Sequence, residues 1–255
     1  MELNLSNLIT PLLVVGLRVS GLVLFAPVFG SPVMPMRLKA VLVIALTAVL
    51  YPVFAARTPG FALQQWPMLV IHETVIGVAM GLAANLVFDA VQLAGQVLSI
   101  QMGYSLASIL DPQTQAESTV MAMFHQTIAL LIFLGLDVHH ALLRAVAGSF
   151  DYLPVETARL TPAFVASTLK VGEAVFSLGV QIAAPVLAAT LVADVVIGLL
   201  GKASPQMPLM LLGTAVKSLL GAAVLLSVIR YWPEFMERGF RGSLIYVEQL
   251  LHLAR

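Results

Sequence analysis

The chain has 255 residues, of which 60% are hydrophobic and only 10% are charged, and its formal net charge is zero. Soluble globular chains carry about 25% charged residues, so this composition offers too little polar surface to cover a compact soluble globule. We therefore expect an integral membrane protein, and the balanced charge provides no basic face for binding nucleic acid. The absence of cysteine excludes disulfides and thiolate metal sites.

Six hydrophobic segments are predicted in chain order, at residues 8–29, 38–55, 68–101, 120–148, 173–200 and 209–231. Because about 20 apolar residues span a bilayer, the third segment is too long for one straight span and must tilt, break or extend beyond the bilayer. A longer polar connection with Pro154 and Pro162 separates the fourth segment from the fifth. The predicted fold is an all-α integral membrane protein of about six partly bent helices arranged as hairpins, followed by a brief amphipathic tail after Pro233.

The first segment differs from a signal peptide, because its first basic residue, Arg18, lies inside the apolar stretch rather than before it. We interpret it as a retained helix. With six spans, both termini lie on the same side of the membrane, and that side carries most of the Lys and Arg residues. Excess Lys and Arg mark the cytoplasmic side, so we expect cytoplasmic termini.

Ionisable side chains also fall inside the apolar stretches. They are Arg18, Glu73, Asp89, Glu173, Asp194 and Lys217. A charge at mid-bilayer costs about 2.5–3.5 kcal/mol on insertion scales, so each needs an opposite charge, a subunit contact or a water-filled path. Ion-coupled transport would use such groups, but the carboxylate-rich broken-helix pattern of transporters is missing from the sequence. We favour pairing between helices or contact with other subunits, for example Asp194 with Lys217 across the last hairpin.

Small residues recur at four-residue steps in the third segment and just after it. They are Gly77 and Gly81, followed by Gly95, Ser99 and Gly103. Residues four apart share one face of a helix, and small side chains there allow another backbone to approach closely in lipid. This spacing predicts tight helix packing without identifying the partner.

Four histidines, His72, His125, His139 and His140, raise the question of a metal site. His139 and His140 are adjacent, so on a helix their side chains should point about 100° apart and should not chelate one ion easily. The sequence also lacks a Gly-rich phosphate loop, a Ser–His–Asp order and a paired-carboxylate constellation. We therefore expect no metal, no other cofactor and no enzymatic activity.

The most informative stretch covers residues 92–123, QLAGQVLSIQMGYSLASILDPQTQAESTVMAM. An apolar helix enters a short polar segment and returns to an apolar helix. The polar segment consists of Ile109, Leu110, Asp111, Pro112, Gln113, Thr114, Gln115, Ala116, Glu117 and Ser118. Proline restrains the residue before it, so Asp111–Pro112 should break the helix. Such a segment near a membrane lines an aqueous cavity or is buried in protein, unless it is a solvent-exposed hairpin loop.

The sequence QMGYSLASILDPQTQ resembles the signature of the FliR/SctT family of type III secretion export-gate subunits. Three further stretches agree, so the similarity covers nearly the whole chain: APVFGSPVMPMRLKAVLVIALT from Ala26, LGLDVHHALLRAVAGSFDYLP from Leu134 and GLLGKASPQMPLMLLGTAVKSLLG from Gly198. The last contains a turn that departs slightly from the family pattern at Ser204 and Pro208.

The resemblance implies two parts, a FliP-like part at residues 1–160 and a FliQ-like hairpin with a short tail at residues 165–255. It implies a core subunit of the flagellar export gate, which forms a helical pore with FliP and FliQ for unfolded flagellar proteins. FlhB and FlhA would be nearby, in the bacterial inner membrane at the flagellar basal body. Residues 109–118 would be a plug in the pore.

Two alternatives remain open at this point. An injectisome homologue would share the mechanism but export virulence effectors. A secondary transporter would move a small solute as a purified chain alone, whereas a gate subunit would be inactive alone and would co-purify with FliP-like and FliQ-like proteins.

Overall fold

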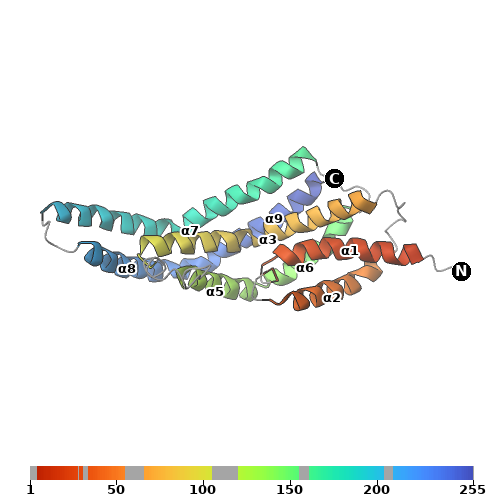
Figure 1. Ribbon diagram of the computed structural model, residues 1–255, viewed down its shortest axis with the longest axis horizontal. Helices are drawn as coiled ribbons and strands as arrows, with labels where there is room; N and C mark the ends of the chain where they lie inside the picture. Colours follow the sequence, from red (N-terminus) through yellow and green to blue (C-terminus); the bar gives the residue numbers. More distant parts are fainter. Residues whose placement is uncertain are drawn as a thin grey trace. The chain divides into compact units, whose positions relative to one another are not determined.

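A computed structural model describes residues 5–27, 29–30, 34–54, 66–104, 120–154, 161–203 and 209–254. In these ranges the protein is helical and contains no strand, so it is an all-α membrane protein (Figure 1). The helices are α1 (Leu5–Phe25), α2 (Met36–Phe54), α3 (Trp66–Gln101), α5 (Val120–Gly135), α6 (Val138–Tyr152), α7 (Pro162–Ala203), α8 (Leu209–Val228), the short 3-10 helix η3 (Ile229–Tyr231) and α9 (Trp232–Leu253).

The fourth predicted segment is divided into two helices, α5 and α6. Asp137, just before α6, has φ 54° in the left-handed region, which an L-residue rarely adopts and which a continuous right-handed helix excludes. The segment is therefore a broken pair of helices. Sequence periodicity missed this break because both halves are apolar.

Two other helices are longer than predicted. Helix α7 begins at Pro162, where the fixed φ of proline suits a first helical position. The Thr161 hydroxyl accepts a hydrogen bond of 3.1 Å from the backbone N–H of Phe164, a typical N-cap. The expected brief tail is the 22-residue helix α9, with Pro233 in its first turn.

Three helical stretches are long and apolar enough to cross a membrane: α3, α7 and residues Leu212–Leu253. The broken pair α5–α6 makes a fourth if it counts as one span. At 1.5 Å per residue, the 36 residues of α3 extend about 54 Å, well beyond a hydrocarbon core of about 30 Å. Over the described ranges, three or four spans thus replace the six expected, and the orientation argued from six spans stays a prediction.

The chain forms two compact units. The first contains Met1–Leu86, Leu136–Glu173 and Gly239–Arg255, and the second contains Val87–Gly135 and Ala174–Arg238. Helices α3, α7 and α9 contribute to both units. The predicted division into residues 1–160 and 165–255 rests on resemblance to FliP-like and FliQ-like proteins, whereas the two units are defined by contacts within the chain. The predicted division therefore stays a prediction.

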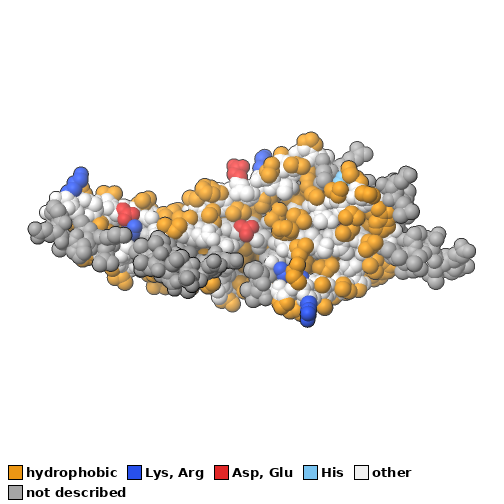
Figure 2. Space-filling model, viewed as in Figure 1, with side chains coloured by type: hydrophobic (Ala, Val, Ile, Leu, Met, Phe, Trp, Pro, Cys, Tyr) orange, Lys and Arg blue, Asp and Glu red, His pale blue; other side chains and the backbone are white. Residues whose placement is uncertain are grey.

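Large apolar side chains are exposed along α7 and α8. Figure 2 shows a face on which hydrophobic side chains are far more extensive than charged ones. Leu169, Leu219 and Leu226 are 75%, 75% and 69% exposed. Exposed apolar surface of this extent marks contact with lipid or with another protein.

Candidate functional site

A buried ion pair lies within the first unit. The guanidinium of Arg18 on α1 donates from Nε to Oε2 of Glu73 at 2.6 Å and from Nη2 to Oε1 at 3.0 Å. Both side chains are 0% exposed. A bidentate pair of this kind is the strong form of an Arg–carboxylate contact, and it joins α1 to α3.

Arg18 also binds the C-terminal end of α6. Nη1 donates to the carbonyl and hydroxyl oxygens of Ser149 at 3.0 and 3.2 Å, and Nη2 donates to the carbonyl oxygen of Leu153 at 3.1 Å. The Ser149 carbonyl also accepts the backbone N–H of Leu153, so Arg18 is its second donor, at a helix end that favours a nearby cation. The Phe150 ring lies 4.2 Å from the guanidinium carbon. One arginine thus connects three helices.

Sequence reasoning identified Arg18 and Glu73 as intramembrane charges but did not pair them. It missed Ser149 and Leu153 because two of the acceptors are backbone carbonyls, which any residue carries. Charged groups inside apolar helices, Arg18 and Glu73, are the signal that pointed to this cluster.

The glycines of α3 lie at close approaches in each unit. A Cβ on Gly77 would collide with the backbone carbonyl of Arg18, and a Cβ on Gly81 would lie 2.9 Å from the carbonyl oxygen of Leu22. Gly21 on α1 completes this crossing, because its Cβ would lie 2.8 Å from the carbonyl oxygen of Thr74. Helices α1 and α3 therefore touch backbone to backbone. The sequence pattern did not include Gly21.

In the second unit, a Cβ on Gly95 would collide with the Cα of Ala122, so α3 and α5 also approach closely. Ser99 is fully buried on α3. Gly103 has a different role, since its φ of 84° ends the helix. The N–H of Tyr104 bonds to the carbonyl of Ser99 at 2.9 Å, and the N–H of Gly103 bonds to the carbonyl of Ile100 at 3.1 Å, which is a Schellman cap.

A second ion pair lies in the second unit. Lys217 Nζ on α8 lies 2.9 Å from Asp194 Oδ1 on α7, and Gln101 Nε2 donates to Asp194 Oδ2 at 3.0 Å. Nearby in sequence, the Ser218 hydroxyl donates to the Tyr104 hydroxyl at 2.8 Å. The Asp194 and Lys217 side chains are 42% and 18% exposed, so the pair is partly accessible. It links α3, α7 and α8.

The remaining charged candidates belong to neither pair. Asp89 is half-buried on α3, and Glu173 is exposed on α7. The predicted plug segment, residues 109–118, lies outside the described residues. The helices that flank it, α3 and α5, are those joined at Gly95 and Ala122.

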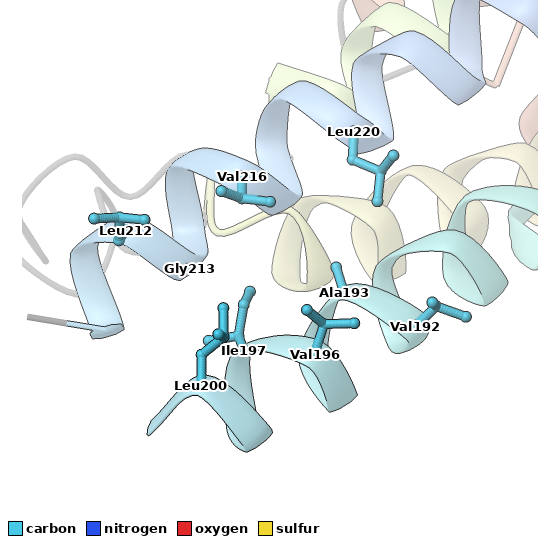
Figure 3. A pocket seen from close by; sticks show the side chains of 9 residues that line it. All are labelled: Val192, Ala193, Val196, Ile197, Leu200, Leu212, Gly213, Val216 and Leu220. Carbon is cyan, nitrogen blue, oxygen red and sulfur yellow. The ribbon is translucent and has the colours of Figure 1, made fainter. Parts of the chain in front are cut away.

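An apolar cavity of about 310 Å³ lies between α7 and α8, and Ile197 from α7 and Leu220 from α8 point into the space between the two helices (Figure 3). The lining contains no charged or hydrogen-bonding side chain, so it offers no specific contact to a polar solute. The residues are Val192, Ala193, Val196, Ile197, Leu200, Leu212, Gly213, Val216 and Leu220.

The histidines occupy different environments. His125 is fully buried, with Nδ1 2.7 Å from the carbonyl oxygen of Met121 and its ring 4.8 Å from that of Trp232. His72 is half-buried. The expectation that His139 and His140 point apart is wrong, because their ring centroids lie only 4.1 Å apart. Both rings lie beside Asp137, whose left-handed backbone turns its carboxylate toward the first turn of α6.

The chain matches known export proteins along most of its length. The family model described as bacterial export proteins, family 1, matches residues 9–243. The chain is 30% identical to the flagellar biosynthetic protein FliR of Escherichia coli, over 88% of this chain and 86% of that protein. It is 29% identical to FliR of Bacillus subtilis, over 84% of each chain. From the extent of these matches, the protein belongs to the bacterial export proteins of family 1.

Proposed function

We propose that this protein is a membrane subunit of the flagellar export apparatus, and more specifically a core subunit of the export gate. The observation that carries the proposal is the family match over residues 9–243, with FliR proteins among the relatives. In this proposal the protein assembles with FliP and FliQ into a pore in the bacterial inner membrane. Unfolded flagellar proteins pass through that pore, with FlhB and FlhA alongside, and the subunit has no catalytic role.

The exposed apolar faces of α7 and α8 suit contact with lipid or with other helices. Large side chains such as Leu199 and Leu219 are 62% and 75% exposed. Lipid is as apolar as these side chains, so helix association there depends on close packing and polar contacts rather than on hydrophobic burial. The partly exposed pair of Asp194 and Lys217 gives this region a polar contact for a neighbouring subunit.

The proposal also assigns two regions by family resemblance. Residues 165–255 act as the FliQ-like part and residues 1–160 as the FliP-like part. Residues 109–118 close the pore at rest. The apolar cavity between α7 and α8 offers a small polar solute no hydrogen bond from its lining side chains.

Co-purification tests the proposal. The tagged chain is co-expressed with FliP and FliQ from the same genome and isolated in mild detergent, and all three proteins should be recovered together. A charged variant on the exposed face, Leu219→Lys, should reduce recovery of the partners. The matched control, Gln249→Lys, adds the same charge at an exposed polar position of α9 and should leave recovery unchanged.

Equal amounts of each variant in the membrane fraction establish that insertion is intact. Recovery of the wild-type chain alone would overturn the proposal, as would uptake of a small solute by the purified chain. Unchanged recovery of FliP and FliQ with Leu219→Lys would show that this face of α8 does not contact them.

A further inference from the structure

Three possible metal ligands converge at the start of α6. Nδ1 of His140 lies 3.2 Å from Oδ1 of Asp137, and Nε2 of His139 lies 3.9 Å from the same oxygen. One donor atom from each residue can be chosen so that all three lie within 4.8 Å of one another. Three donors from a four-residue stretch are therefore close enough to share one ion.

These separations are near those of a tetrahedral site. With metal–nitrogen and metal–oxygen distances of about 2.0–2.1 Å, two ligands of a tetrahedral Zn²⁺ lie roughly 3.3 Å apart. The distance between Asp137 and His140 matches this value, and the distance between Asp137 and His139 exceeds it by little. The third separation, between the donor nitrogens of His139 and His140, is bounded at 4.8 Å, so the histidine side chains would rotate to complete the site. The remaining coordination position would be open to water.

The residue types select the class of ion. Imidazole suits Zn²⁺, Ni²⁺ and Cu²⁺, whereas Mg²⁺ and Ca²⁺ prefer oxygen ligands. Without a metal, the Nδ1–H of His140 donates to the Asp137 carboxylate, which only accepts. Binding through Nδ1 would move that proton to Nε2, and the carboxylate would then contact the ion directly. The side chains of Asp137, His139 and His140 are 71%, 27% and 58% exposed, which gives the ion an entry path.

We propose that Asp137, His139 and His140 form a binding site for a divalent transition metal of the zinc class. All three ligands lie within one turn, so the ion would fix the start of α6 rather than cross-link distant helices. Asp137 is already held at φ 54°, and a bound ion would stabilise this conformation further. The proposal is independent of the pore-forming role proposed above.

Metal binding to the purified full chain tests the site directly. The chain carries a tag without histidine and is dialysed in detergent against buffered Zn²⁺. The wild type should bind one Zn²⁺ per chain, and Co²⁺ should give the visible absorption typical of a low-coordinate site. His139→Gln and His140→Gln should each weaken Zn²⁺ affinity by roughly tenfold or more, since even groups behind the ligands contribute ~10–100-fold.

Two substitutions at Asp137 separate ligand loss from misfolding. Asn tolerates the left-handed region, and Gly adopts it without steric cost, so Asp137→Asn and Asp137→Gly should keep the helix content while weakening Zn²⁺ binding. His252→Gln is the matched control, because His252 lies on α9, beside Tyr152 and outside the cluster. Absence of Zn²⁺ binding to the wild type would overturn the proposal. So would wild-type affinity in the triple variant lacking all three ligands.

Discussion

Arg18 on α1 and Glu73 on α3 form a bidentate ion pair that is completely removed from solvent, although 55 residues separate them in sequence. The same guanidinium binds the carbonyl oxygens of Ser149 and Leu153 at the end of α6. A charge buried without partners would cost several kcal/mol. The arrangement therefore holds the first unit together only while all its members are present.

Breaking this pair from one side should be strongly destabilising. Glu73→Gln keeps the shape of the side chain but leaves the buried Arg18 charge uncompensated, at an expected cost of about 3–5 kcal/mol. Arg18→Met should cost at least as much, because it also removes the Arg18 hydrogen bond to the carbonyl oxygen of Leu153. Thermal unfolding in detergent measures both variants.

The double variant, Arg18→Met with Glu73→Gln, should lose less than the sum of the two single losses, because no unpaired charge remains. Losses that add within ~0.5 kcal/mol would contradict coupling between the two residues. Arg238→Gln is the control. It removes the arginine of an exposed pair with Glu234 on α9 and should leave the unfolding temperature unchanged.

A methyl group at the crossing of α1 and α3 should also destabilise the first unit. Gly77→Ala places a Cβ against the backbone of Arg18, which cannot move without shifting the helix, and the expected cost is about 1–3 kcal/mol. Thermal unfolding is again the measurement. Gly172→Ala on α7 is the matched control, since nothing lies within 4 Å of its added Cβ.

The control should be neutral or stabilising by about 0.5–1 kcal/mol, because alanine is a better helix former than glycine. If Gly77→Ala behaves like Gly172→Ala, the close approach of the two helices is refuted.

Charge reversal should show whether the ion pair of Asp194 and Lys217 contributes to assembly. The charged atoms of the pair now lie 2.9 Å apart. Asp194→Lys would place two ammonium groups at this position, and Lys217→Asp would place two carboxylates there. Each should reduce recovery of FliP and FliQ with the tagged chain. The swapped double variant should partly restore recovery, because the Gln101 amide offers both a donor and an acceptor to the new side chain.

Equal failure of the single and double variants would reject a role for the pair in assembly. Glu234→Lys reverses an exposed charge on α9, outside this cluster, and serves as the control for added positive charge.

Deletion of residues 111–117 should open the assembled gate. If residues 109–118 plug the pore, their loss removes the barrier to small ions, and the assembly in a planar bilayer should conduct at rest. A second variant replaces the same residues by a Gly–Ser linker of equal length. It keeps the length of the connection and removes only the side chains of the plug, so it distinguishes the two effects of the deletion. Conductance equal to that of the wild type in both variants would count against the plug.

The sequence by itself determined the class of protein and most of its helices. Low charge and high hydrophobicity are sums over the chain, so they predict a membrane protein without any knowledge of contacts. The four-residue glycine spacing is likewise local, and it located Gly77, Gly81 and Gly95 at close helix approaches. The intramembrane charges were also visible, since each interrupts an apolar run.

Only the tertiary structure decided which of these residues meet. Arg18 reaches Glu73, Ser149 and Leu153 through distances of 55 to 135 residues, and backbone acceptors carry no signal in the sequence. A single left-handed residue, Asp137, broke a segment that periodicity predicted as continuous, and the rings of His139 and His140 lie 4.1 Å apart just after it. Composition and periodicity report the local environment of each residue, whereas pairing depends on how separate helices pack, and that is a property of the folded chain alone.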